Sequence, residues 1–285
     1  MDGLSETSNI PYAGYEYSGR LYFEQISAVF MVLDKKIRSM LRLDAKEPRH
    51  GATQFWHYFP AGIPGVIEFG FWSGVGSHDL RPHFHNETQI AIVLAGSRAF
   101  RINDTIVTVA AGEGISIPAG LLHAPLATPN SASVCLNVYL EDKRTASSYN
   151  MFNIHDILSG FDMISSENLL RSTNAAPPTV RSVRMKPVTA SSFRTALMQS
   201  DMRIGDIAAD FDRSREGFSR QVTRELGVAP HCFRLLSRLN HARQLLRDGQ
   251  PIAAVAADAG FSDQSHMTRL FRRTFGTTPG LYRRI

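Results

Sequence analysis

The sequence of 285 residues contains only two cysteines, Cys135 and Cys232. They lie in different halves of the chain, and neither belongs to a group with the spacing of metal-binding thiols. We therefore expect two reduced thiols that pack as small apolar residues, and no metal site built from cysteine.

Long hydrophobic runs are also missing. The most apolar early stretch, Ile26 to Leu33, is far shorter than the roughly 20 residues that a membrane-spanning helix needs, and Lys35 and Lys36 follow it. The first residues, MDGLSETSN, are acidic and polar, unlike a secretory signal peptide. These features predict a cytoplasmic protein without membrane association.

The charge is distributed unevenly along the chain. Residues 1–140 hold 10 Lys and Arg against 12 Asp and Glu, whereas residues 186–285 hold 16 against 9. Of those 16 basic residues 15 are Arg, the side chain best suited to bidentate contacts with phosphate or guanine. With an apolar content of 43%, this indicates a soluble protein of about two domains, of which the C-terminal one binds a polyanion.

Residues 251–275, PIAAVAADAGFSDQSHMTRLFRRTF, predict a helix, a turn and a second helix. Gly260 tolerates a left-handed backbone, and Ser262 or Asp263 can cap the second helix. The polar face of that helix carries Gln264, Ser265, Thr268, Arg269, Arg272 and Arg273. Such groups suit base edges and phosphates in a major groove, although a solvated helical hairpin has the same pattern.

A second copy of this unit lies upstream. Residues 204–230 are similar in sequence to residues 252–279. Both segments contain Ala-Ala-Asp, then a serine, then an apolar residue two positions before an arginine, and both end in Gly-x-x-Pro. Between the copies, helical spacing of apolar residues predicts one long helix through Phe233, Leu239 and Leu246. Two recognition helices held by a rigid spacer would enter successive major-groove segments of one duplex.

Between residues 66 and 140, short apolar runs separated by turn residues predict an antiparallel barrel or sandwich. The expected strands are 66–72, 89–94, 98–102, 106–109, 114–117 and 134–140. Helical periodicity also predicts helices at 24–43 and 153–170. Residues 172–182, which contain two adjacent prolines, are expected to be the interdomain linker.

Two motifs that contain histidine lie in the barrel region. The first comprises Gly76, His83, His85, Gln89 and Gly96, and the second comprises Gly112, Pro118, Gly120 and His123. Residues two apart in a strand point the same way, so His83 and His85 can face one cavity, which His123 could join. Three imidazoles and an amide suit a divalent metal, the wall of a small-molecule pocket, or a hydrogen-bond network at the strand ends. We expect a pocket without metal for an organic effector, with Arg81 available to bind a carboxylate.

The two histidine motifs resemble those of the cupin barrel. In metal-binding cupins the first motif carries a Glu where this chain has Gln89, and an Asn usually follows the second motif where this chain has Ala127.

The phrase AxxxGFSDQSxxxRxFxxxxGxxP at residues 256–279 resembles the second helix-turn-helix of the AraC/XylS family of bacterial transcription regulators. The resemblance is close over residues 186–285 and looser over 66–140. It implies a regulator that binds double-stranded promoter DNA, responds to a small-molecule effector, forms a homodimer, contacts RNA polymerase and more often activates than represses. The implied DNA-binding residues, with neighbouring polar and basic residues, are Glu216, Ser219, Arg220, Arg224, Gln264, Ser265, Thr268, Arg269, Arg272 and Arg273. Gly217 departs from the family pattern and should weaken the first recognition helix by roughly 1 kcal/mol relative to Ala.

The sequence therefore predicts a multidomain α+β protein. It comprises an N-terminal segment 1–50, a cupin-like antiparallel β-barrel 51–142, a helical and linker region 143–185, and an all-α domain 186–285 with helix-turn-helix units at about 204–226 and 252–275. We expect a DNA-binding transcription regulator with no catalytic activity, no metal and no cofactor. Two alternatives are a metal-dependent cupin enzyme fused to a DNA-tethering module, and a ligand-free regulator controlled by its abundance or by partner proteins.

Overall fold

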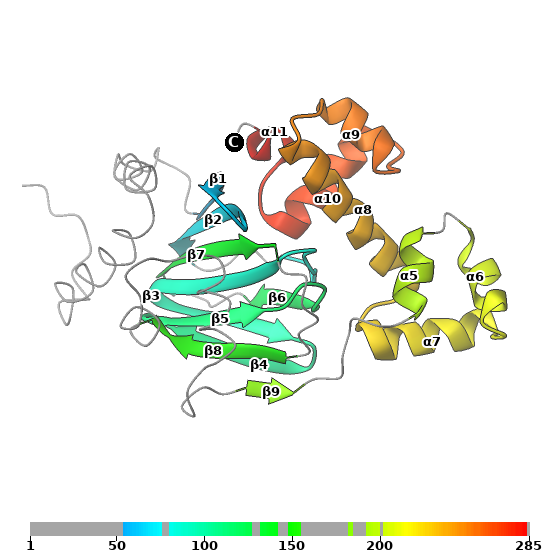
Figure 1. The fold of residues 1–285 in the computed structure, drawn as a ribbon, viewed down its shortest axis with the longest axis horizontal. Coiled ribbons are helices and arrows are strands. Elements are labelled where there is room, and N and C mark those ends of the chain that lie inside the picture. The colour runs from blue at the N-terminus through cyan, green and yellow to red at the C-terminus, as the bar shows by residue number, and fades with distance from the viewer. Residues whose placement is uncertain are drawn as a thin grey trace, which may run out of the picture.

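The computed structural model describes residues 54–75, 80–126, 132–141, 148–154, 182–184, 192–199 and 202–283. These residues form a sheet domain and a helical domain that lie side by side (Figure 1). The helix expected at 24–43 lies outside the described residues, and so do nearly all of the helix expected at 153–170 and of the linker expected at 172–182.

The sheet domain is antiparallel throughout. Its strands are β1 (Gln54–Ile63), β2 (Val66–Val75), β3 (Thr88–Ile102), β4 (Thr105–Ala110), β5 (Glu113–Ile117), β6 (His123–Leu126), β7 (Ala132–Leu140), β8 (Ser148–Asn153) and β9 (Ser182–Arg184). They pair in the order β1-β2-β7-β3-β5-β8-β9, and β4 and β6 both add to β3. Within the described residues this path does not return from β9 to β1, so the predicted cupin-like domain is confirmed as a curved, open sheet and not as a closed barrel.

Strand β3 organises this domain, and it corrects the prediction of two separate strands at 89–94 and 98–102. Its first half pairs with β5 and β7, and its second half with β4 and β6. The change of partners coincides with a register shift between Val93 and Ala95, next to Gly96 at φ +70. A Cβ on Gly96 would lie 2.0 Å from the carbonyl oxygen of Ala132, so the glycine permits a bend within one continuous strand.

Both faces of the sheet are apolar around β3. Ile90 and Ile92 pack in one cluster with Phe69, whereas Ala91 and Val93, pointing the opposite way, pack in another with Trp72. We call the second cluster the sheet interior, because it also collects the core-facing residues of β4, β5 and β7.

The helical domain contains the predicted repeat. Its helices are α5 (Ser192–Gln199), α6 (Ile204–Asp210), α7 (Arg215–Leu226), α8 (Pro230–Arg247), α9 (Ile252–Asp258), α10 (Gln264–Phe275) and α11 (Pro279–Tyr282). Helix α8 separates the α6–α7 pair from the α9–α10 pair (Figure 1), which confirms two helix-turn-helix units joined by a long helix.

The two recognition helices, α7 and α10, begin and end in the same way. The Ser214 hydroxyl caps α7 by accepting from the Gly217 N–H at 3.1 Å, and the Asp263 carboxylate caps α10 by accepting from the His266 N–H at 2.7 Å. Gly227 and Gly276 end the helices in the left-handed region, at φ 76 and φ 77. Gly217 therefore lies in the capped first turn of α7 and not in the helix interior.

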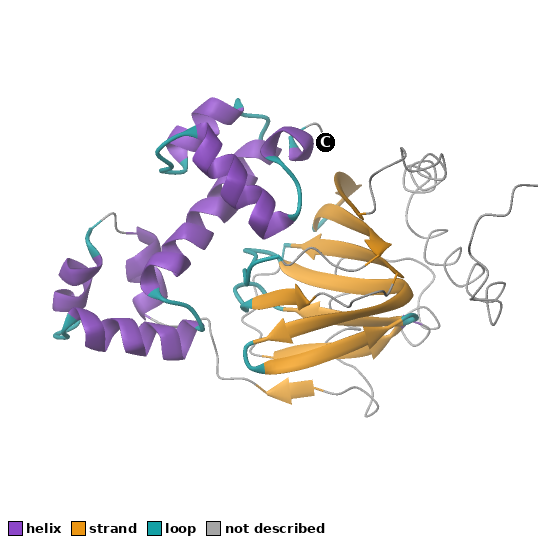
Figure 2. Cartoon of the chain, turned by 180° about the vertical axis from the view of Figure 1, so that it is seen from behind, coloured by secondary structure: helices purple, strands orange, loops and turns teal. Residues whose placement is uncertain are grey.

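The two domains share one hydrophobic cluster. Tyr58, Phe84 and Tyr139 of the sheet domain belong to the same buried group as Phe233 and Phe275 of the helical domain. Figure 2, seen from behind, also shows the helical domain against one end of the sheet. The recognition helix α10 thus belongs to a unit that is packed onto the sheet domain.

Candidate functional site

The polar face of α10 is open to solvent. Met267 and Phe271 are fully buried, whereas Gln264, Arg269 and Arg273 are exposed. A hollow of about 850 Å³ is lined by Leu80, Gln264, Ser265, Thr268, Arg269, Arg272, Arg273 and Thr278. All six predicted DNA-contacting residues of α10 therefore lie together on one side of the helix.

The corresponding face of α7 is arranged in the same way but carries a different charge. Glu216, Arg220 and Arg224 are exposed and Ser219 is partly exposed, while Phe218 is buried beneath them. An acidic residue in the first turn makes this face less favourable for phosphate than that of α10, which has no acidic residue in its first turn.

The sheet domain touches the polar face of α10 through residues 80 and 81. Leu80 lines the same hollow, and the Arg81 N–H donates to the Arg273 carbonyl oxygen at 3.1 Å. The side chain of Arg81 is exposed, so the structure places it outside the buried histidine cluster for which it was predicted. Only its backbone takes part there, because the Arg81 carbonyl oxygen accepts from His83 Nδ1 at 2.7 Å.

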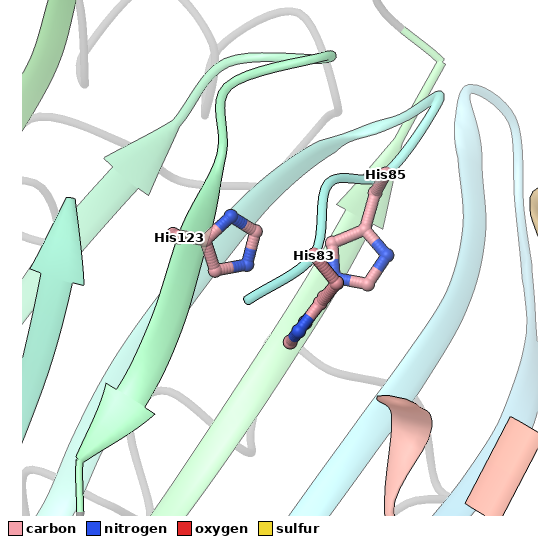
Figure 3. A group of neighbouring side chains, drawn as sticks. All are labelled: His83, His85 and His123. Atoms are coloured by element: carbon pink, nitrogen blue, oxygen red, sulfur yellow. The ribbon is translucent and has the colours of Figure 1, made fainter. Parts of the chain in front are cut away.

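His83, His85 and His123 converge as predicted (Figure 3). Their ring centroids lie 4.6 to 5.2 Å apart, and one ring nitrogen from each can be chosen so that all lie within 4.8 Å of one another. His83 and His85 do not lie in a regular strand. Reciprocal backbone hydrogen bonds of 2.8 Å between His83 and His123 hold the first motif against β6.

Hydrogen bonds fix which ring nitrogen carries the proton. His83 and His123 donate from Nδ1 to carbonyl oxygens, so each keeps a lone pair on Nε2. Arg243 Nη1, which can only donate, lies 2.7 Å from His85 Nδ1, so His85 must accept there and carry its proton on Nε2. Burial lowers the pKa of all three rings, that of His123 to about 4, and the Arg243 charge lowers the pKa of His85 further. The cluster is therefore neutral at pH 7.

Three neutral imidazoles are a fitting ligand set for a transition-metal ion, and Nε2 of His85 and of His123 are buried without a hydrogen-bond partner. In this arrangement, however, His85 presents an N–H to the centre of the cluster and not a lone pair. The residues could bind a metal only if Arg243 released His85.

Gln89 borders the same cluster. It pairs across strands with Tyr139, whose ring centroid is 5.0 Å from that of His85. Its amide donates to Asn137 Oδ1 at 2.8 Å, and its own Oε1 is buried without a partner.

A buried ion-pair network that was not predicted from the sequence joins the two domains. Arg243 is fully buried, bonds to Glu68 and donates from Nε to the Tyr282 hydroxyl at 3.1 Å. Arg247 bonds to Glu87 at 2.7 Å, and the Tyr282 hydroxyl donates to Glu68. Burial opposes ionisation of Glu87, but Arg243 and Arg247 outweigh it and lower the pKa of that carboxyl. One signal was available: Arg243 stands on the apolar stripe of the spacer helix, four residues after Leu239.

The C-terminal end of α10 closes the histidine cluster. The Phe275 ring lies 6.1 Å from that of His83 and 5.9 Å from that of His85, and the Tyr58 hydroxyl donates to the Phe275 carbonyl oxygen at 2.9 Å. The three imidazoles are therefore in mutual contact, and Phe275 and Arg243 cover them on the side of the helical domain.

In comparison with known proteins, the sheet domain and the helical domain match two different families. Residues 207–285 match a family model described as a helix-turn-helix domain, and residues 74–139 match one described as a cupin domain. The chain therefore carries a helix-turn-helix domain and a cupin domain, the combination that its resemblance to AraC-type transcriptional regulators predicts.

Individual relatives of the chain are distant. The probable transcriptional regulator LumQ of Photobacterium leiognathi is 23% identical over 224 residues, which cover 70% of this chain and 90% of LumQ. The transcriptional activator NphR of a Rhodococcus species is 39% identical over 89 residues, which cover 31% of this chain and only 26% of NphR. Among solved structures, ToxT of Vibrio cholerae is similar with a TM-score of 0.48 and 12% identity, over 75% of this chain and 96% of that chain. No helix in the described part of this chain is long and apolar enough to cross a membrane.

Proposed function

We propose that this AraC-type regulator binds promoter DNA sequence-specifically through α7 and α10, and that a small-molecule effector in the sheet domain changes this binding. The observation that carries the proposal is the duplicated helix pair on the two ends of α8. Each pair presents one capped helix with a polar, exposed face and a buried apolar face. This arrangement suits recognition helices held for one duplex.

Helix α10 is proposed as the stronger reader of sequence. Gln264 and Arg269 can each pair with a base edge, and Arg272 and Arg273 can neutralise phosphates. On α7, Glu216 can accept a hydrogen bond from cytosine but repels the backbone, so Ser219, Arg220 and Arg224 would supply most of its contacts.

Effector control is proposed to act through the contact between the domains. Leu80 borders the recognition face of α10, and Phe275 at the end of the same helix covers the histidine cluster. An effector that enters beside His83, His85, Gln89 and His123 therefore has to compete with the docked position of α10. While the domains are docked, Leu80 also restricts the approach of DNA to the polar face of α10.

The names of two relatives support activation of transcription. NphR and the HTH-type relative RhaS of Escherichia coli are named transcriptional activators. We extend to this chain activation through contact with RNA polymerase, assembly as a homodimer, and work in the cytoplasm, where bacterial DNA lies. A catalytic role is not proposed, because the relatives are named regulators and His85 presents an N–H to the centre of the cluster.

The experiment is selection of duplexes from a random pool by the full-length protein, followed by binding to the selected duplex with and without a metabolite extract. A shared sequence motif, bound with an affinity that falls steeply as salt rises, is the expected result. A pool that stays random would contradict sequence-specific binding. Stoichiometric metal in the purified protein, lost in a His83→Ala variant, would favour the enzyme alternative instead.

A further inference from the structure

Arg98 is a charged side chain inside the sheet interior without a counter-ion. It follows the bend of β3 and points the same way as Phe100 and Ile102. Only 3% of its surface is exposed, and its Nη1 is buried without a hydrogen-bond partner. Within the described part of the chain, no carboxylate pairs with it. Arg243, by contrast, is equally buried but is paired with Glu68.

The groups nearest to the Arg98 charge do not neutralise it. The electrostatic neighbours of the guanidinium are Cys135, Tyr139 and Tyr58. Burial raises the pKa of the Cys135 thiol to about 11 and that of the Tyr58 hydroxyl to about 12, and it also raises the pKa of Tyr139. At neutral pH all three are uncharged, so the sheet interior holds a cation and no described anion beside it.

Two tryptophans that contact each other, with ring centroids 5.3 Å apart, both lie against one side of this cation. The guanidinium carbon lies 4.8 Å from the Trp72 ring centroid and 5.4 Å from that of Trp56. Cation–π contacts recover part of the lost hydration, but they leave Nη1 of the guanidinium without a hydrogen-bond acceptor. A buried guanidinium with an unused donor beside two aromatic rings is complementary to a small organic anion.

We infer that Arg98 binds the carboxylate of a small organic acid inside the sheet domain, with Trp56 and Trp72 against the organic part. This names the chemical class of the effector and in that respect rests on the proposed function. A carboxylate is preferred because its two oxygens match the planar guanidinium in a bidentate pair.

Trp56 connects this site to the recognition helix. One face of its ring lies toward Arg98, and the edge carrying Nε1 lies against Gly276, the residue that ends α10. A Cβ on Gly276 would come within 2.5 Å of the Trp56 ring, so nothing separates the two. An acid that enters between Arg98 and Trp56 must move the tryptophan, and with it the end of α10.

The chain provides its own reporter, because Trp56 and Trp72 are the only tryptophans in the sequence. Tryptophan emission of the full-length protein is titrated with acetate, hexanoate and benzoate. The neutral amides of the same acids serve as matched controls, and inorganic phosphate serves as a carbon-free anion. We expect a saturable change with at least one carboxylate and none with its amide.

In Arg98→Met the affinity should fall by about tenfold or more, which corresponds to the loss of one charge-assisted hydrogen bond. Arg101→Met, an exposed arginine on the same strand, should leave the affinity unchanged.

Three results would overturn the inference: no response to any of the three acids, equal responses to acid and amide, or an unchanged affinity in Arg98→Met. Equal binding of phosphate would overturn the choice of an organic acid. If Arg98→Met does not fold, thermal unfolding of the unaltered protein decides, because only a bound carboxylate, and not its amide, should raise Tm. None of these measurements uses DNA. Carboxylate binding without DNA binding would contradict the proposed function alone, and the reverse would contradict only this inference.

Discussion

Arg243 Nη1 of the spacer helix lies 2.7 Å from Nδ1 of His85 in the sheet domain. This hydrogen bond ties a residue of the DNA-binding domain to the centre of the proposed effector region, and it determines the tautomer of His85. The same guanidinium is bonded to Glu68, so docking of the domains and the state of the histidine cluster depend on one side chain.

Replacing Arg243 should release the helical domain. Arg243→Met removes the closest ionic partner of the buried Glu68, which keeps the Tyr282 hydroxyl and Arg247 at 3.6 Å. Breaking a buried ion pair in this way typically costs about 3–5 kcal/mol. We expect a lower free energy of unfolding and faster protease cleavage between the domains. Adding Glu68→Leu should restore much of the loss, since the uncompensated charge is then gone. Strictly additive losses in a denaturant double-mutant cycle would contradict the pairing.

Two glycines test how closely α10 is packed on the sheet domain. Gly249 and Gly276 have nearly the same φ, 81 and 77, but a Cβ on Gly249 meets nothing within 4 Å. Gly249→Ala should therefore show only the backbone cost of about 1–2 kcal/mol. Gly276→Ala adds the collision with Trp56 and should be clearly less stable, with a shifted tryptophan emission. Equal thermal stability of the two variants would mean that Trp56 does not pack there.

The histidine cluster predicts loss of stability in mild acid. The pKa of His123 in the folded protein is about 4, below its ordinary value of about 6.5, so between these values the unfolded chain binds a proton that the folded protein does not. The free energy of unfolding should fall as pH drops from about 6.5 to about 4, by up to about 3 kcal/mol for this residue. His123→Gln should flatten the profile, whereas the exposed His241→Gln should leave it as it is. A profile that His123→Gln does not change would contradict a buried neutral imidazole.

The helical domain was predictable because its signals are local. Glycine and an acidic cap bracket α10 within the chain, and the internal repeat doubles every signal. The strands were less predictable. A turn residue and a bulge residue look alike in sequence, so Gly96 suggested a break in β3 where the structure has a bend.

The candidate site was also predictable only where its signals are local. Convergence of the histidines followed from their spacing, but their closure by Phe275 depends on the docking of two domains far apart in sequence. Arg81 was predicted to lie at the histidine cluster, but its side chain is exposed. The described arginines that are buried are Arg98 and Arg243, and their burial depends on contacts far apart in sequence. An arginine among apolar residues at helical or strand spacing was the signal that would have found both.

Sequence recognition by α10 is measured as the affinity of the full-length protein for its selected duplex and for a random duplex, before and after Arg269→Ala. Arg101→Ala removes the same charge from the sheet domain and controls for net charge. We predict that Arg269→Ala lowers the preference for the selected duplex by about 1–3 kcal/mol, or about 5- to 150-fold, while Arg101→Ala keeps it. An unchanged preference in Arg269→Ala, or an equal loss in both variants, would contradict sequence recognition by α10.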